Sequence, residues 1–279
     1  MITFEDVTKF YAGQDRPALR NINLEIAKGE FVFLVGQSGS GKSTFLRLIL
    51  REYRPTKGTL YVAGKNLSTL NQWKVPALRR QIGTVFQDFR LLPGKTVYEN
   101  VAFALQVIGK SSKIIRRVVP ETLRLVGLEG KENRLNEELS GGEQQRIGIL
   151  RAIAAKPDIL LMDEPFSALD PLARASLQET VSLIHKKLGT TIVFVTHDMN
   201  EAAKLACRIG VMHQGRLVQV DTPQDIQNHP ADDYVRSLFG AAQPENTISA
   251  DKVINLYRRL DADGKARVRE YWAQNRMDV

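Results

Sequence analysis

The chain has 279 residues, of which 43% are hydrophobic and 25% are charged, as is typical of a globular protein with a sizeable core. No segment approaches the ~20 apolar residues of a membrane-spanning helix, and the first ten residues alternate like a strand instead of forming a secretory signal, so we expect a cytoplasmic protein. The net charge of +8 is spread along the chain without a nucleic-acid-binding motif, so we expect no nucleic-acid partner, and the single Cys207 excludes an internal disulfide.

Short apolar segments with the pattern of strands recur through the first 240 residues. The early segments are separated by turns such as Lys28-Gly29, whereas helical patterns separate several of the later ones. We therefore predict an α/β core with a mostly parallel sheet, to which the early strands add an antiparallel β subdomain. The strand candidates cover residues 2–7, 21–26, 31–35, 59–62, 82–86, 159–162, 191–195 and 208–212.

Residues 36–43 read GQSGSGKS, which fits the phosphate-loop pattern GxxxxGK[ST], and they lie between an apolar strand run and a helical run. Glycines let backbone N–H groups approach phosphate oxygens, and the N-terminus of the following helix adds partial positive charge. We predict that Lys42 reaches the β- and γ-phosphates of a nucleotide and that the Ser43 hydroxyl ligates Mg²⁺. A flexible Gly/Ser turn is the alternative interpretation. The predicted nucleotide contacts are Gly36, Ser38, Gly39, Gly41, Lys42, Ser43 and Thr44.

Two regions have helical patterns in place of alternating β and α patterns. Over residues 88–138 the strand pattern disappears and apolar residues follow helical spacing, as in Val97, Val101 and Leu105, which predicts an inserted α-helical subdomain. Residues 241–279 are polar and charged, and they are predicted to form a helical C-terminal tail appended to the catalytic part.

Two adjacent carboxylates, Asp163 and Glu164, follow the apolar run at 159–162. This places them at the carboxyl end of a strand, where ligands bind in open parallel sheets. Alone, an apolar strand ending in Asp-Glu is common and is more often structural. Beside a phosphate loop, we predict that Asp163 holds Mg²⁺ through water and that Glu164 orients the attacking water or accepts its proton.

A second glycine pair begins another helical run, because residues 139–146 read LSGGEQQR, and it predicts a further anion-binding helix N-terminus. This octapeptide resembles the signature sequence of ABC-type ATPases, and the resemblance covers residues 1–240. It implies an α/β fold with a P-loop NTPase core of ABC type, in which 1–240 form the nucleotide-binding domain. It also implies that Ser140, Gly141 and Gly142 bind the γ-phosphate of an ATP molecule held by a second copy of the chain.

The remaining landmarks of that family follow in the expected order. The resemblance implies that Tyr11 stacks on adenine, although an ordinary half-buried tyrosine at a strand end fits too. It implies that Gln87 contacts Mg²⁺ and the attacking water, where an ordinary surface glutamine is the alternative. It also implies that Asp170 lies in a loop crossing the dimer interface, where a plain helix cap is the alternative. His197 matches a histidine that contacts the γ-phosphate, whereas a lone histidine after a strand is more often structural.

The implied activity is ATP hydrolysis by in-line attack of water on the γ-phosphate, with ATP and Mg²⁺ as cofactors. The implied catalytic residues are Glu164, His197, Gln87 and Lys42, and the implied Mg²⁺ contacts are Ser43, Gln87 and Asp163. Each copy carries half of each site, so a homodimer around two ATP molecules is expected, bound to an integral membrane subunit at the inner face of the cell membrane. A soluble ABC protein acting on nucleic acid or the ribosome is a remote alternative. A P-loop kinase is a further alternative, but such an enzyme would need no signature sequence.

Different parts of the chain resemble two different subfamilies. Residues 1–145 resemble the FtsE-type cell-division ATPase, as in TVFQDFRLLP at 84–93. Residues 146–240 resemble the ATPase of glycine betaine/choline (quaternary amine) importers, as in FVTHDMNEA at 194–202. A recombined chain with its junction within 139–150 and a natural chain that mixes both sets of features are the two interpretations.

The choice of membrane partner follows from this division. In the family that the chain resembles, the membrane subunit inserts a short helix into a cleft beside the helical subdomain. That cleft is predicted to be lined by residues 88–138, with Phe89, Leu91, Leu92 and Tyr98 as apolar anchors. An FtsX-type partner is therefore predicted in preference to a quaternary-amine permease.

Overall fold

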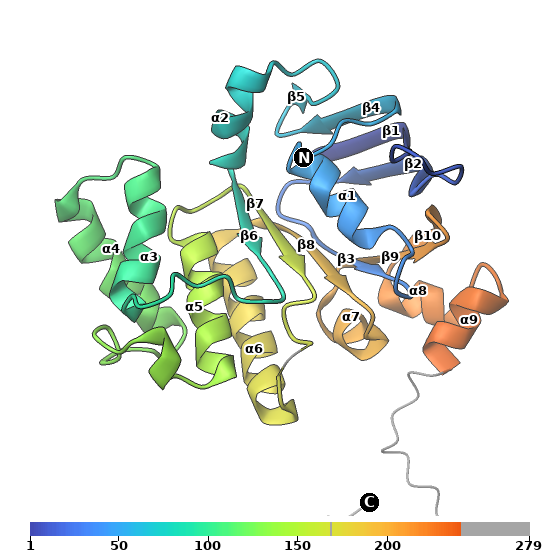
Figure 1. Ribbon diagram of the computed structural model, residues 1–279. Helices are drawn as coiled ribbons and strands as arrows, with labels where there is room; N and C mark the ends of the chain where they lie inside the picture. The colour runs from blue at the N-terminus through green and yellow to red at the C-terminus, as the bar shows by residue number, and fades with distance from the viewer. Residues whose placement is uncertain (168, 241–279) are drawn as a thin grey trace, which may run out of the picture. The chain divides into compact units, whose positions relative to one another are not determined.

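The computed structural model describes residues 1–167 and 169–240, so the tail predicted over 241–279 lies outside the described part of the chain. Two sheets and the helices around them make up this part (Figure 1). The first compact unit ends at Phe239. The domain boundary at residue 240 and the role of the tail stay predictions.

The smaller sheet is antiparallel and has the strand order β2-β1-β4-β5. Along β2, buried and exposed residues nearly alternate, with Ile22, Leu24 and Ile26 buried, because one face packs on the core and the other meets solvent. Its strands come from the early part of the chain, as the sequence predicts. They are β1 (Ile2–Lys9), β2 (Leu19–Ile26), β4 (Lys57–Val62) and β5 (Lys65–Asn66).

The larger sheet has the order β10-β9-β3-β8-β7-β6 and is parallel except at β10. Its central strands are buried along almost their whole length, which is why they read as continuous apolar runs in the sequence. The prediction of an α/β core with a mostly parallel sheet is confirmed. The strands are β3 (Phe31–Val35), β6 (Ile82–Val85), β7 (Ile159–Asp163), β8 (Thr191–Thr196), β9 (Arg208–His213) and β10 (Arg216–Asp221).

Strand β10 is absent from the predicted strands. It pairs antiparallel with β9 through the two-residue turn Gln214-Gly215, where both residues have positive φ. That geometry is the tight hairpin turn that matches the twist of paired strands. The strand's residues are mostly half-buried, so its apolar pattern is weak, and the glycine-containing turn was the available signal.

Helices cover the larger sheet, and two of them, α3 and α4, fall within the interval predicted to be helical. Helix α3 packs against α4 and α5, and Figure 1 shows this group beside β6 at one edge of the sheet. The helices are α1 (Lys42–Ile49), α2 (Val75–Arg79), α3 (Val97–Val107), α4 (Ser112–Leu125), α5 (Gly141–Ile153), α6 (Pro171–Leu188), α7 (Met199–Leu205), α8 (Pro223–Asn228) and α9 (Asp233–Gly240), with short 3₁₀ turns at Gln72–Lys74 and Asn136–Glu138.

Helix α1 lies between the two sheets. Phe45 of α1 stacks on Phe4 of β1 at 4.1 Å between ring centroids, and the same buried cluster includes Val32 and Leu34 of β3. Aromatic stacking and apolar burial on both sides fix the direction of this helix. The loop that leads into α1 is thereby held at the carboxyl end of β3.

Candidate functional site

The loop between β3 and α1 is the phosphate loop of the sequence, and its glycines are required by both space and conformation. Gly36 has φ 152° and Gly41 has φ 105°. A Cβ atom at Gly36 would lie 2.2 Å from the carbonyl oxygen of Met212, and one at Gly41 would lie 2.6 Å from that of Ala18. Any other residue would therefore push the loop away from β9 and from the segment before β2.

The N-terminus of helix α1 has no side-chain capping hydrogen bond among the described residues. Gly41 is its N-cap, and its first turn contains no acidic residue. The Lys42 ammonium donates to the carbonyl oxygens of Gly36 at 2.7 Å and Gln37 at 3.0 Å. Burial lowers the pKa of Lys42, while the nearby carboxylates of Glu164 and Asp163 oppose that shift. A buried cation beside a bare helix N-terminus suits a phosphate group.

The structure brings Ser43 and Asp163 together across the gap between α1 and the end of β7. Burial raises the pKa of Asp163 and the charge of Glu164 adds to that shift, whereas Lys42 and a hydrogen bond with Ser43 oppose it. A hydroxyl and a carboxylate oxygen at one point are donors that Mg²⁺ accepts together with phosphate oxygens and water. These two residues could hold the ion that the sequence predicts here.

Gln87 lies in the turn that follows β6. In the parallel pairing of β6 with β7, Val85 stands opposite Met162, so Gln87 and Asp163 leave the sheet at the same edge. The Gln87 side chain is exposed. The arrangement places it on the Asp163 side of the site, and its contacts with Mg²⁺ and water stay predictions.

Glu164 and His197 are in direct contact, although they follow different strands. The Glu164 Oε2 lies 3.0 Å from Nδ1 of His197, just beyond β8. Glu164 has φ 44°, a left-handed conformation that costs a non-glycine residue free energy, and its backbone N–H donates to Val195 O at 2.9 Å. The backbone thus holds one carboxylate at the edge of the sheet, with an imidazole to orient it.

Tyr11 lies next to the first turn of α1. Its hydroxyl oxygen is 3.1 Å from Oγ1 of Thr44, and its ring meets that of Tyr53 edge-on at 5.2 Å between centroids. The ring is half-buried. The position beside the phosphate loop agrees with a contact to adenine, and the packing on Tyr53 agrees with an ordinary structural tyrosine, so stacking stays a prediction.

The second glycine-rich segment begins α5 and belongs to another part of the unit. Figure 1 shows α5 beside α3, whereas α1 lies beside the antiparallel sheet. Ser140 is the N-cap of α5 and forms a capping box with Glu143. A Cβ atom at Gly142 would lie 3.0 Å from the Cβ of Ala173, so this segment packs against the start of α6.

Asp170 caps that neighbouring helix. Its Oδ1 accepts hydrogen bonds from the backbone N–H groups of Leu172 and Ala173, both at 3.0 Å. The cap that the sequence left as the alternative is therefore present. Leu172, in the first turn of α6, is 85% exposed. The predicted site residues therefore lie in two groups. One group, at the starts of α5 and α6, is Ser140 to Gly142 with Asp170. The other group, around the start of α1, is Lys42, Ser43, Asp163, Glu164 and His197.

Sequence reasoning did not single out Tyr234, which reaches the phosphate loop from α9. Its hydroxyl accepts a hydrogen bond from the Gln37 backbone N–H at 3.2 Å, and its ring lies 3.8 Å from that of His213 between centroids. The two residues joined by the hydrogen bond are 197 positions apart. No local pattern around Tyr234 signals such a contact.

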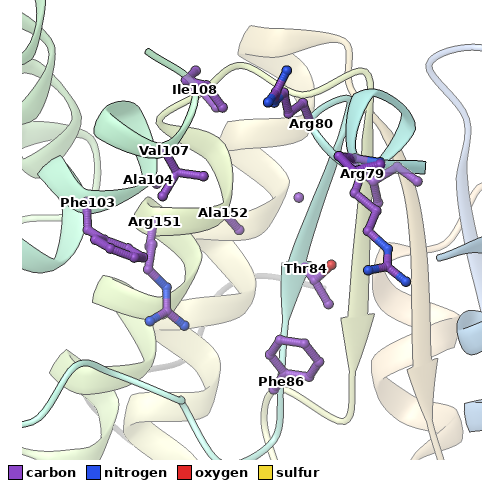
Figure 2. A pocket seen from close by; sticks show the side chains of 14 residues that line it. Arg79, Arg80, Thr84, Phe86, Phe103, Ala104, Val107, Ile108, Arg151 and Ala152 are labelled. Carbon is purple, nitrogen blue, oxygen red and sulfur yellow. The ribbon is translucent and has the colours of Figure 1, made fainter. Parts of the chain in front are cut away.

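A pocket of about 480 Å³ opens between the larger sheet and the helical region (Figure 2). This pocket differs from the cleft predicted over residues 88–138. Phe103, Ala104, Val107 and Ile108 come from that range, whereas residues of and next to α2, β6 and α5 supply the other walls. The predicted anchors Phe89, Leu91, Leu92 and Tyr98 do not line it. The sequence could not show how α2 and α5 close the space. The lining residues are Pro76, Arg79, Arg80, Ile82, Gly83, Thr84, Phe86, Phe103, Ala104, Val107, Ile108, Arg151, Ala152 and Ala155.

One wall of the pocket is tied to the turn that carries Gln87. The Arg151 guanidinium donates to the carbonyl oxygens of Phe89, at 3.1 Å, and of Arg90. Both of these residues have positive φ, and the Arg90 guanidinium stacks on the ring of Phe86 at 3.9 Å. Contacts made in the pocket by Phe86 or Arg151 therefore bear directly on the position of the Gln87 turn.

Comparison with known proteins identifies the family of these motifs. A family model described as ABC transporter matches residues 19–167. The cell division ATP-binding protein FtsE of Mycobacterium tuberculosis is 52% identical over 219 residues, which cover 78% of this chain and 95% of that protein. The choline transport ATP-binding protein OpuBA of Bacillus subtilis is 45% identical over 253 residues, which cover 90% of this chain and 65% of that protein.

A solved structure extends the likeness to the fold. The dimeric structure of an ATP-binding cassette in a post-hydrolysis state with ADP and Pi has a TM-score of 0.72 and 36% sequence identity, covering 80% of this chain and 99% of that one. The predicted fold of ABC type is confirmed. Among residues 1–167 and 169–240, none of the helices has the length and apolar character needed to cross a membrane.

Proposed function

The chain belongs to the ABC transporter family and is one of its ATP-hydrolysing subunits, and from this premise we propose that two copies close around two ATP molecules and drive an integral membrane subunit. The observation that carries the proposal is the division of the motifs into two groups. The phosphate loop, Asp163 and Glu164 meet at one edge of the sheet, and the N-terminus of α5 belongs to a different part of the unit.

Within each site we assign the chemistry to the group around α1. Ser43, Asp163 and Gln87 would hold Mg²⁺, which would neutralise charge on the γ-phosphate of ATP together with Lys42. Glu164 would orient the attacking water. The contact with Nδ1 of His197 fixes the Glu164 carboxylate and leaves the imidazole beside it for the γ-phosphate. Positioning and charge neutralisation are the main sources of catalysis in phosphoryl transfer.

The dimer supplies what one copy lacks. Each copy would present Ser140, Gly141 and Gly142 to the ATP of the other, with Asp170 and the exposed Leu172 at the interface. The dimeric cassette that resembles this chain supports this arrangement.

For the membrane subunit we propose the pocket of Figure 2 as the docking site and an FtsX-type protein as the favoured partner, with the complex at the inner face of the cell membrane. The alignment with FtsE covers nearly all of that relative, whereas the chain spans about two thirds of the importer relatives' length. An osmoprotectant importer of the quaternary-amine type is the second candidate, since the OpuBA alignment covers more of this chain.

The chemistry of the pocket constrains the partner. Among the described residues that line it, three are arginines, none carries a carboxylate, and the rest are mostly apolar. A short helix with an apolar face and an acidic side chain fits such a surface, because the charges attract while the apolar atoms leave water. Binding of the partner helix in the pocket would change the position of the Gln87 turn through the contacts of Arg151 and Phe86.

The test is capture of both membrane subunits in detergent with ATP and the Glu164→Gln variant. We expect the FtsX-type protein to be retained, and Arg79→Glu with Arg80→Glu to reduce its capture. Lys57→Glu, at the exposed start of β4, should leave capture unchanged. Preferential capture of the quaternary-amine permease would reverse the choice of partner.

A recombined chain with a junction at 139–150 stays a prediction, and the FtsE alignment of 219 residues necessarily crosses that junction.

A further inference from the structure

The N-terminus of α5 is already occupied by one of its own side chains. The Glu143 Oε2 accepts hydrogen bonds from both the backbone N–H and the hydroxyl of Ser140, each at 2.9 Å. In return, the Glu143 backbone N–H donates to Oγ of Ser140 at 3.4 Å. The Ser140 hydroxyl has a single proton, so while that proton points to Glu143 it cannot be donated to a phosphate oxygen.

Glu143 is paired with a lysine that belongs to none of the motifs. The Lys131 ammonium forms an ion pair with Oε1 of Glu143, the carboxylate oxygen that Ser140 does not use. The loop around Lys131 is tied down by its backbone, since its N–H donates to Leu128 O at 3.2 Å and its carbonyl accepts from the Arg134 N–H at 3.0 Å. The contacts with Lys131 and Ser140 lower the pKa of Glu143 to about 2, so the carboxylate is charged at neutral pH.

A charged carboxylate at this place works against the proposed dimer in two ways. It repels an approaching triphosphate, and it competes with the terminal phosphate for the Ser140 proton. An ammonium group on the other carboxylate oxygen reduces both effects, because it cancels the net charge and draws electron density away from the oxygen that Ser140 bonds.

We propose that Lys131 is a positioning residue for ATP-driven closure: by neutralising Glu143, it lets Ser140 transfer its hydrogen bond from that carboxylate to the terminal phosphate of the ATP held by a second copy. The proposal rests on the proposed ATP-bound dimer and adds a residue to it. Lys131 acts through Glu143 and Ser140 and does not touch the nucleotide.

The experiment is a double-mutant cycle on dimer formation in the full chain. Starting from Glu164→Gln, which retains ATP, we would add Lys131→Met, Glu143→Gln or both, and measure by light scattering the ATP concentration for half-maximal dimerisation. Lys131→Met is expected to raise that concentration roughly 3- to 10-fold, since each dimer contains two such pairs. In the Glu143→Gln background the same change should shift it less than about twofold, because no carboxylate charge remains to be neutralised.

Lys131→Arg is the matched control and should remain within about twofold of the parent, because it keeps the charge. Nucleotide affinity of the monomer, read with a fluorescent ATP analogue, should be equal in all variants, and a purely structural role of Lys131 would show as an equal loss with and without Glu143→Gln. That equal loss, or no effect of Lys131→Met, overturns the inference alone. A Glu164→Gln parent that stays monomeric with ATP overturns the proposed dimer and the inference together.

Discussion

The helices α1 and α5 both begin at glycine-rich segments, but their first turns are prepared differently. The N-terminus of α1 has a glycine cap in a left-handed conformation, no described capping side chain and no acid in its first turn. The N-terminus of α5 has Ser140 as its cap and Glu143 three residues later, joined in a reciprocal capping box. One helix start is bare, and the other is satisfied by its own side chains.

This difference distinguishes the two proposed phosphate sites. At α1, a phosphate would meet uncommitted N–H groups and the Lys42 ammonium, so we expect one copy to bind nucleotide alone. At α5, a phosphate would have to take over a hydrogen bond that Glu143 already receives. Closure of the proposed dimer would therefore require an exchange of contacts at α5, and we expect it to follow nucleotide binding at α1.

The strongest way to test the comparison is to remove the chemistry at the α1 site while leaving binding intact. Glu164→Gln keeps the hydrogen bonds to water and to His197 but loses basicity, so turnover should fall by roughly 10²- to 10⁴-fold. ATP should still bind and produce a shift from monomer to dimer in light scattering. Hydrolysis at the parent rate would mean that the role given to Glu164 is wrong.

Lys42→Ala should weaken ATP binding at the N-terminus of α1. Loss of a charge-assisted contact with phosphate is worth about 1.5–3 kcal/mol, so ATP affinity should fall roughly 10- to 100-fold. Equilibrium binding of a fluorescent ATP analogue measures this loss, with Lys57→Ala at the exposed start of β4 as the control. Unchanged affinity would contradict the assignment of the phosphate loop.

The glycines of the α1 loop can be compared with each other. Gly41→Ala places a Cβ atom 2.6 Å from Ala18 O at φ 105°, whereas Gly39→Ala at φ 77° has nothing within 4 Å. We expect Gly41→Ala to lower the free energy of unfolding by about 2–4 kcal/mol and Gly39→Ala by only about 1–2 kcal/mol. Urea denaturation distinguishes the two, and equal losses would show that loop packing does not require Gly41.

Ser140→Ala sharpens the comparison from the α5 side. Loss of this N-cap should lower the free energy of unfolding by about 1 kcal/mol, a cost that has no counterpart at α1, where glycine is the cap. The variant should also weaken ATP-driven dimerisation more than monomer affinity for ATP. Ser140→Thr retains the hydroxyl and should recover most of the stability, and failure to do so would argue against the capping contact.

The smallest effect is expected from deleting the residues after Gly240. The compact unit ends at Phe239, and both helix starts and all the predicted site residues precede that point. Basal ATP hydrolysis should therefore remain within about twofold of the full chain, since removal of a charged appendage leaves the catalytic groups in place. A collapse in soluble yield or activity would instead place the tail on the catalytic unit.

The sequence by itself determined the elements whose information is local. The phosphate loop follows a buried strand and begins a helix, and Asp163 and Glu164 end another buried strand, so their meeting at one sheet edge follows from the parallel topology. The continuous apolar runs of β3, β7 and β8 were readable because both faces of the sheet are covered. The half-buried β10 lacked such a run.

Only the tertiary structure decided which distant residues meet. The contact of Tyr234 with Gln37, the pairing of Lys131 with Glu143 and the lining of the pocket by α2 and α5 each join segments that no periodic pattern connects. Periodicity and motif spacing describe a segment and its neighbours along the chain, whereas these contacts depend on how packed elements cross in space. For that reason the placement of the phosphate loop beside Asp163 and Glu164 was predictable, while the capping of the α5 helix start by Glu143 and its pairing with Lys131 were not.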